Sequence, residues 1–234
     1  MNLIILEKED IHDGKVEISG EKFDHILKYI KPVTGDTLRA GILNGPMGEG
    51  VVTNIGHKRI SLSLTIESRP PAPLPLKLIL AMPRPKVFNR VIQHAASMGI
   101  KEIYIIKTWR VEKSYWESPV LEQENLRRQM IKGLEQGKDT VMPTIQIRKR
   151  FKPFIEDELP SIIKETLALV FHPAVKDQCP HRVDFPVTIA LGPEGGFIPY
   201  EIDRLQDIGF RAVSLGNRIL RVETVLPFLM GRLF

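Results

Sequence analysis

The sequence predicts a parallel α/β domain preceded by a small β-barrel, in a chain of 234 residues. Before residue 69, apolar and polar residues alternate in short segments separated by turns, as expected of half-buried strands. Residues 69–75 include four prolines, which neither donate to a sheet nor continue a helix. After them, apolar strands alternate with helical patterns. We therefore expect a barrel over 1–68, a stiff linker over 69–75 and an α/β domain over 76–234.

Within the expected barrel, period-2 alternation predicts strands at 15–18, 37–43, 50–52 and 60–66. Apolar residues at helical spacing predict one helix over 21–30.

The second domain has expected strands at 76–82, 103–106, 167–171 and 187–191. Their residues are almost wholly apolar, which is typical of a parallel sheet buried on both faces. Helices are expected over 87–98, 119–137, 200–208 and 224–233, and the first and third should end at glycines.

Composition and charge are those of an ordinary globular protein, with 43% hydrophobic and 26% charged residues and a net charge of +5. Residues 1–68 hold 8 basic and 10 acidic residues, whereas 69–234 hold 25 and 18. The excess is greatest over 127–152 and favours a polyanion such as nucleic acid, although a solvated helix face explains it equally well. A single cysteine, no signal-peptide pattern and no apolar run of about 20 residues predict a cytoplasmic protein outside the membrane.

Two glycine-containing segments follow apolar strands near the C-terminus: L-G-P-E-G-G-F at 191–197 and S-L-G-N-R-I-L-R-V-E-T at 214–224. Open α/β sheets bind ligands where strands end in this way, and glycines allow the main chain to approach a ligand closely. Neither segment is a nucleotide-triphosphate or dinucleotide motif. An adenosyl group would suit main-chain contacts between apolar walls, while two ligand-free turns remain the alternative.

The chain resembles the RsmE family of the SPOUT superfamily of knotted RNA methyltransferases that use S-adenosylmethionine. The resemblance rests on the two glycine segments, on V-I-Q-H-A-A-S-M-G-I at 91–100 and on residues 25–36, and it covers nearly the whole chain. It implies N3-methylation of a uridine in 16S ribosomal RNA, a trefoil knot, a PUA-like barrel that binds RNA, and a homodimer. The particular uridine, and naked RNA or the assembled small subunit as substrate, stay open.

Residue roles follow from the resemblance and the reaction. The expected S-adenosylmethionine-binding residues are Leu191, Gly192, Gly196, Leu215, Gly216, Ile219, Leu220 and Thr224. A carboxylate could accept the proton of uridine N3, and Glu194 and Glu223 are the candidates, while Arg221 or Arg218 could stabilise the developing negative charge. An ion pair between Arg221 and Glu223 that only fixes the loop is almost equally well supported.

The expected RNA-binding residues are Lys31, Arg84, Lys86, Arg110, Arg127, Arg128 and Lys138. Trp109 and Trp116 could stack on bases, although we expect at least one in the core. No metal is expected, because His172, Cys179 and His181 fit no zinc spacing. Two other functions remain open: a ribose 2′-O-methyltransferase, or an RNA-binding protein without catalysis.

Overall fold

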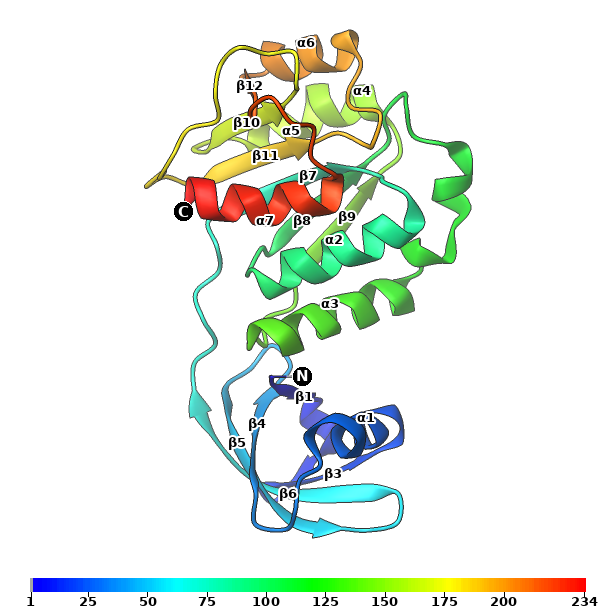
Figure 1. Cartoon of the computed structure of the whole chain (residues 1–234), viewed down its shortest axis with the longest axis vertical. Helices are drawn as coiled ribbons and strands as arrows, with labels where there is room; N and C mark the ends of the chain where they lie inside the picture. Colours follow the sequence, from blue (N-terminus) through cyan, green and yellow to red (C-terminus); the bar gives the residue numbers. More distant parts are fainter. Residues whose placement is uncertain (1) are drawn as a thin grey trace. The chain divides into compact units, whose positions relative to one another are not determined.

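The computed structural model describes residues 2–234. They form two compact units, one made of the described residues up to 72 together with 131–142, and the other of 73–130 and 143–234 (Figure 1). The division between 72 and 73 lies within the expected linker. The inclusion of 131–142 in the first unit was not anticipated by the expected bounds of 1–68 and 76–234.

The first unit is built on one six-stranded sheet in the order β1-β4-β5-β6-β3-β2. Its strands are β1 (Ile4–Leu6), β2 (Ile11–His12), β3 (Lys15–Ser19), β4 (Thr37–Ile42), β5 (Met47–Ile55) and β6 (Arg59–Ser68). Neighbours are antiparallel except β1 and β4. Alternating residues of these strands enclose one apolar core, as at Val16 and Ile18 of β3. The two short strands β1 and β2 had no alternating pattern long enough to predict them.

The helix of the first unit begins at Gly20 and changes its form part-way. A 3₁₀ turn, η1 (Lys8–Asp10), precedes it in the chain; α1 (Gly20–His25) then continues as a π-helical segment, η2 (Ile26–Ile30). Lys31 ends the helix with a left-handed backbone, φ 54°. Of the predicted helical face, Phe23 and Ile26 pack into the core and Leu27 packs against it, whereas Ile30 is exposed.

Residues 131–142 join the first unit through main-chain hydrogen bonds. The carbonyl of Glu135 accepts from the N–H of Leu3 (3.1 Å), and that of Thr140 accepts from the N–H of Asn44 (2.8 Å). The Thr140 hydroxyl donates to the carbonyl of Gly45 (2.6 Å). The end of α3 (Gln123–Gly137) is thereby fixed to the turn between β4 and β5.

The second unit has a six-stranded, wholly parallel sheet in the order β12-β10-β11-β7-β8-β9. Its strands are β7 (Leu76–Ala81), β8 (Glu102–Ile106), β9 (Thr144–Arg148), β10 (Leu167–Phe171), β11 (Val187–Leu191) and β12 (Arg211–Val213). The predicted α/β class is confirmed. The late strand β11 lies between β10 and β7, so the carboxyl ends of these three strands meet at one edge.

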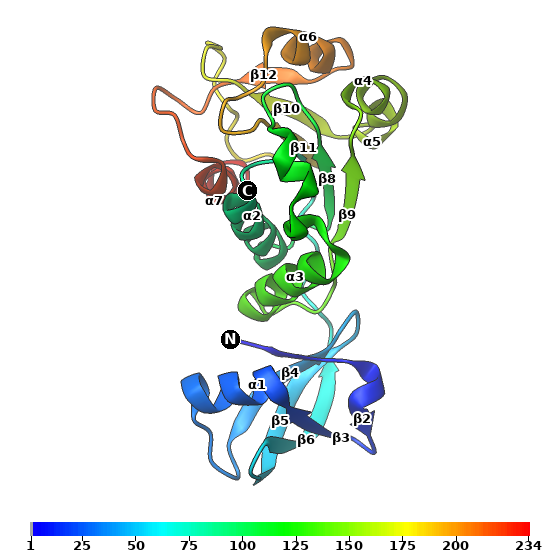
Figure 2. The same cartoon turned by 90° about the vertical axis from the view of Figure 1, so that its right-hand side faces the viewer.

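Helices cover both faces of this sheet: α2 and α7 lie side by side on one face, and α4 and α5 lie towards the other (Figures 1 and 2). The second unit contains α2 (Pro85–Ser97), η3 (Lys113–Glu117), η4 (Pro119–Leu121), the first half of α3, α4 (Phe151–Pro153), η5 (Phe154–Glu158), α5 (Leu159–Ile162), α6 (Pro199–Asp207) and α7 (Val222–Leu233). Among the described residues, no helix combines the length and apolar character needed to cross a membrane.

The last helix is fastened at its C-terminal end. The Arg232 guanidinium donates two hydrogen bonds to the carbonyl of buried Cys179, at 2.9 and 2.6 Å. The Val183 N–H donates to the carbonyl of Leu233 at 2.7 Å. Burial raises the pKa of the Cys179 thiol, against the opposing effect of Arg232. These bonds hold the loop between β10 and β11 against α7.

Candidate functional site

A cavity of about 600 Å³ opens at the carboxyl edge of the parallel sheet. Its lining comes from segments that follow β7, β8, β10, β11 and β12, together with the first turn of α7. In open α/β sheets this is the edge at which ligands bind. The two glycine segments follow β11 and β12, and they reach one cavity because β10 pairs with both of these strands.

The first glycine segment forms a close loop around Gly192. A Cβ at Gly192 would lie 3.0 Å from the Phe197 nitrogen, closer than ordinary van der Waals contact. Gly196 has φ +69°, its N–H donates to the Pro193 carbonyl (2.7 Å), and no atom lies within 4 Å of its Cβ position. Phe197 is buried and anchors the loop. The glycines thus let the chain turn while the side facing the cavity stays open.

The second glycine segment turns at Gly216, which resembles Gly196 in its positive φ and open Cβ position. Its φ is +106°, and nothing lies within 4 Å of its Cβ position. The hydroxyl of buried Ser214 accepts from the Gly216 N–H at 3.2 Å and fixes the turn. Within the described residues, the N–H groups of Leu215 and Leu220 donate to no other main-chain carbonyl. The main chain of both glycine loops is therefore uncovered at the cavity, which suits a ligand bound through backbone N–H and C=O groups.

Two arginine side chains at this cavity have no ion-pair partner among the described residues. Arg218 and Arg221 are exposed, both line it, and neither makes a salt bridge or side-chain hydrogen bond within residues 2–234. Glu223 also lines it, but its ion pair is with Arg90 of α2 (Nη1 to Oε1, 3.7 Å). The expected alternative pairing of Arg221 with Glu223 is therefore wrong. The guanidinium groups of both arginines are therefore available to attract an anion.

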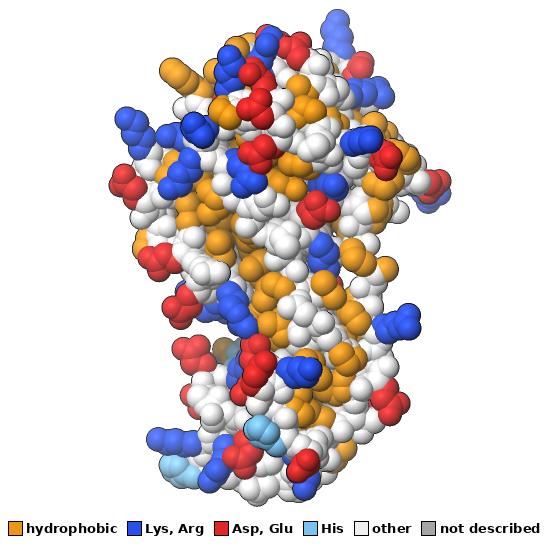
Figure 3. Space-filling view, turned by 180° about the vertical axis from the view of Figure 1, so that it is seen from behind, with side chains coloured by type: hydrophobic (Ala, Val, Ile, Leu, Met, Phe, Trp, Pro, Cys, Tyr) orange, Lys and Arg blue, Asp and Glu red, His pale blue; other side chains and the backbone are white. Residues whose placement is uncertain are grey.

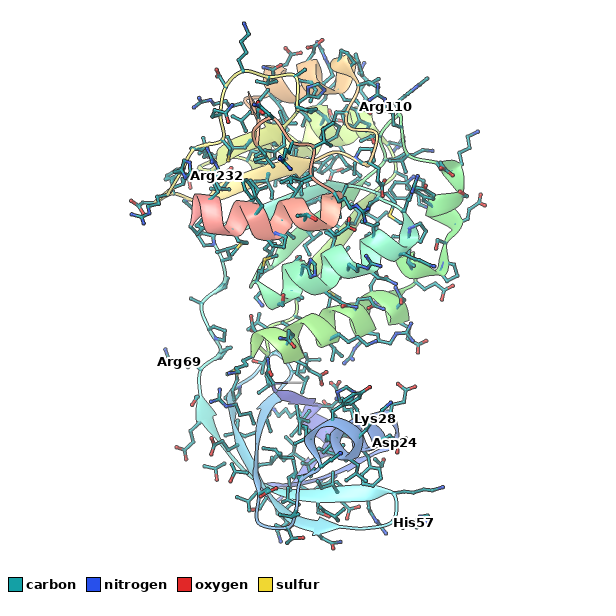
Figure 4. The ribbon with its side chains drawn as sticks, in the orientation of Figure 1. Asp24, Lys28, His57, Arg69, Arg110 and Arg232 are labelled. Atoms are coloured by element: carbon teal, nitrogen blue, oxygen red, sulfur yellow. The ribbon has the colours of Figure 1, made fainter. Side chains whose placement is uncertain are left out.

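Glu194 is fixed to another loop of the same cavity. Its Oε1 accepts a hydrogen bond from the main-chain N–H of Arg84, at 3.0 Å, just before α2. Arg110, in the loop after β8, donates from its guanidinium to the carbonyl of Gly195 (Figure 4). These bonds join the loops after β7 and β8 to the first glycine loop.

Comparison with known proteins identifies the family of this chain. A family model described as "RNA methyltransferase domain" matches residues 70–233, which is more than half of the chain. The chain belongs to the RNA methyltransferase domain family.

Members of this family with a curated name resemble the chain over most of its length. The Treponema pallidum protein named ribosomal RNA small subunit methyltransferase E is 29% identical over 231 residues, 96% of this chain and 87% of that protein. The protein of that name from Mesomycoplasma hyopneumoniae is 31% identical over 159 residues, 66% of this chain and 67% of that protein. The resemblance to the RsmE family noted in the sequence is confirmed.

A solved structure shares the fold. The crystal structure of a ribosomal RNA small subunit methyltransferase E from Neisseria gonorrhoeae, bound to S-adenosyl methionine, has a TM-score of 0.75 with this chain. The two chains are 20% identical, and the match covers 98% of this one and 95% of that one. At this identity the comparison establishes the common fold.

Most of the residues expected to bind the methyl donor lie in the cavity lining. Those present are Leu191, Gly192, Gly196, Leu215, Gly216, Ile219 and Leu220, and the four expected catalytic residues line it as well. Thr224 does not line it and is exposed. The helix α7 begins at Val222, so Val222 and Val225, one turn apart, face the cavity in place of Thr224.

The expected RNA-binding residues are more dispersed. Arg84 and Arg110 line the cavity, whereas Lys86, Arg127 and Arg128 are exposed elsewhere in the second unit. Lys31 and Lys138 belong to the first unit, each with a positive φ at a helix end. On the face of the molecule in Figure 3, basic side chains lie interspersed with acidic ones. That face carries no continuous basic patch.

The cavity includes residues that sequence reasoning missed. Phe171 ends β10, His172 and Pro173 follow it, and Val87 lies in the first turn of α2. Strand 167–171 was predicted, so the rule that ligands bind at carboxyl ends of strands could have indicated the first three. Within the described residues, no group of three His, Cys, Asp or Glu side chains is arranged to hold a metal ion.

Proposed function

We propose that this protein is an S-adenosylmethionine-dependent methyltransferase that methylates N3 of a uridine in 16S ribosomal RNA. The observation that carries the proposal is the cavity of about 600 Å³ between two glycine loops with open main chain, beside two arginines that have no ion-pair partner within residues 2–234. The named relatives act on small-subunit ribosomal RNA according to their names, and the Neisseria structure holds S-adenosyl methionine.

The residues fit the methyl donor by their chemistry. Bound S-adenosylmethionine supplies an electrophilic methyl group on a sulfonium sulfur. The loops would hold it through main-chain groups of Gly192, Gly196, Leu215, Gly216 and Leu220, with apolar Leu191 and Ile219 as walls. A side chain at Gly196 or Gly216 would project into open space at the cavity and also strain the backbone.

The chain's polar residues would then act on the uridine. Its N3 carries a weakly acidic proton, which must leave before the nitrogen can accept a methyl group. We assign this proton to the Glu223 carboxylate, whose ion-pair partner Arg90 is 3.7 Å away, beyond hydrogen-bond distance. Arg221 and Arg218 would stabilise the negative charge that develops on the base oxygens. Glu194, already bonded to Arg84, would position the first loop.

The finer architecture is also part of the proposal. Strand β11 comes late in the chain but lies between β10 and β7 in the sheet. This arrangement supports a trefoil knot of the RsmE type. The first unit, with its six-stranded sheet and Lys31 at the end of its helix, would be the PUA-like RNA-binding domain. Partly exposed Phe228 of α7 and Phe234, just after this helix, offer apolar surface for a homodimer. We further propose a cytoplasmic location and a small-subunit substrate.

Mass spectrometry of nucleosides tests the proposal. Small subunits or 16S RNA that lack the modification would be incubated with the protein and isotopically labelled S-adenosylmethionine, then digested. We expect labelled 3-methyluridine. Label in a 2′-O-methyl nucleoside would make the protein a ribose methyltransferase instead. Absence of label, with RNA binding retained, would make it a non-catalytic RNA-binding protein.

A further inference from the structure

Trp109 is a tryptophan left almost fully in solvent. Its side chain is 82% exposed, whereas Trp116, the other tryptophan, is partly buried. Tryptophan has the largest apolar side chain, and folding usually buries most of it. A single exposed apolar residue is by itself unremarkable, so the question is how the chain holds this one.

The main chain of Trp109 is held firmly even though its ring is free. The Trp109 N–H donates to Oε1 of Glu201, at 2.7 Å, and Glu201 is only 3% exposed. The other carboxylate oxygen of Glu201 accepts from the Ile198 N–H at 2.9 Å. The Val111 N–H closes the turn onto the Thr108 carbonyl at 3.2 Å. A buried carboxylate thus links the Trp109 turn to the start of α6, which fixes the main chain from which the exposed ring projects.

This turn stands at the edge of the candidate active site. The next residue, Arg110, lines the cavity and donates to the carbonyl of Gly195 in the first glycine loop (Figure 4). Trp109 itself does not line the cavity. Its exposed ring projects from a turn whose next residue lines the cavity, where it is available to a group next to the one that enters the cavity.

We propose that Trp109 stacks on a base of the RNA strand that neighbours the nucleotide to be methylated. The inference rests on the proposed function, since it requires an RNA nucleotide in the cavity. Stacking on an exposed indole tolerates any base, because every base has a π face. Trp109 therefore adds affinity and holds the strand at the opening, while base identity is read inside the cavity.

Fluorescence measures this contact independently of methyl transfer. In a Trp116→Phe variant, Trp109 is the one remaining tryptophan. Titration with single-stranded oligouridylate should quench its emission saturably, and the quenching should weaken with salt. Unchanged emission at RNA concentrations that fully bind the protein would overturn the inference.

Kinetics on unmodified 16S RNA and small subunits give the second readout. Trp109→Ala should raise the KM for RNA by about tenfold with little change in kcat, since one base–aromatic stack is worth roughly that much. Trp109→Phe should recover most of the affinity, and the Kd for S-adenosylmethionine should not change. Phe185→Ala is the matched control: Phe185 is 51% exposed and precedes β11, at the opposite edge of the sheet from the cavity.

The outcomes separate the two proposals. If the wild-type protein transfers no methyl group to RNA, the proposed function fails whatever Trp109 does. If it transfers methyl and Trp109→Ala has an unchanged KM, the stacking inference alone fails.

Discussion

The Glu194 carboxylate accepts a hydrogen bond from the main-chain N–H of Arg84, 110 residues earlier in the chain, at 3.0 Å. This bond ties the loop before α2 to the first glycine loop, and both residues line the same cavity. Glu223, the other carboxylate there, has only the more distant Arg90, at 3.7 Å, as an ion-pair partner among the described residues. The two carboxylates should therefore differ in role, Glu194 positioning a loop and Glu223 accepting a proton.

Amide substitutions separate these roles. Glu194→Gln keeps an oxygen that can accept from the Arg84 N–H, so we expect kcat within a few-fold of the wild type. Glu223→Gln keeps the shape but cannot take up a proton, so kcat should fall by about 10²-fold or more, with the Kd for S-adenosylmethionine unchanged. Single-turnover methylation of 16S RNA measures both variants. Equal losses in the two would contradict the assignment.

Arg221 should act on the reaction and not on donor binding. Because its guanidinium is exposed and has no ion pair within the described residues, we expect Arg221→Ala to lower kcat by about 10²- to 10³-fold, as when other groups that stabilise a developing negative charge are removed. Calorimetry should show unchanged binding of S-adenosylmethionine. Arg211→Ala is the control, since Arg211 begins β12 at the opposite edge of the sheet. Unchanged turnover in Arg221→Ala would remove it from the catalytic residues.

Arg232 should stabilise the second unit. Its two hydrogen bonds to the carbonyl of buried Cys179 would be lost in Arg232→Ala, leaving that carbonyl without these donors, at a cost of about 1–3 kcal/mol. Thermal unfolding should show a Tm lower by several degrees. Arg182→Ala is the matched control, because Arg182 bonds to Arg232 through its main-chain N–H, which the substitution retains. Equal Tm values for the two variants would show that the guanidinium bonds contribute nothing.

Glu135 should make stability depend on pH. Burial raises the pKa of its carboxyl above 4.5, although Lys22 and a hydrogen bond from the Ile5 main chain oppose the shift, and one carboxylate oxygen is buried without a partner. A carboxyl with a raised pKa binds its proton more tightly in the folded state. The contribution to stability is thus greatest below pH 4.5 and declines as the pH rises towards the folded pKa.

Comparison with Glu135→Gln measures this effect. The variant has no proton to lose, so its Tm relative to the wild type should rise between pH 4.5 and neutral pH. Glu124→Gln, at an exposed position of the same helix, is the control and should follow the wild type. Parallel Tm profiles for wild type and Glu135→Gln would contradict the raised pKa.

Much of the second unit could be predicted because its signals are local. Apolar runs gave β10 and β11 at their observed bounds, and Gly99 and Gly209, both with positive φ, end α2 and α6 as expected. β9 (Thr144–Arg148) was missed because its residues are only partly buried and carry polar side chains. The position of β11 between β10 and β7 depends on long-range pairing, which no local pattern encodes.

In the candidate site and in the first unit, too, local signals could be read from the sequence and long-range contacts could not. Glycine loops at strand ends could be recognised, but the Arg90 partner of Glu223 required the packing of α2 against α7. Thr224 was misplaced because its position depends on where α7 begins. Nothing in the sequence indicated that Thr140 would bond to Gly45, 95 residues away, and so bring 131–142 into the first unit.

Calorimetric titration of S-adenosylmethionine into wild type, Gly216→Val and Gly209→Ala tests most directly whether the glycine loops bind the methyl donor. Gly216 and Gly209 have nearly equal φ of +106° and +109°, so both substitutions strain the backbone, but only Gly216 lines the cavity. We expect one S-adenosylmethionine bound per chain in the wild type and in Gly209→Ala, and none in Gly216→Val. No binding to the wild type, or equal binding to all three, would contradict it.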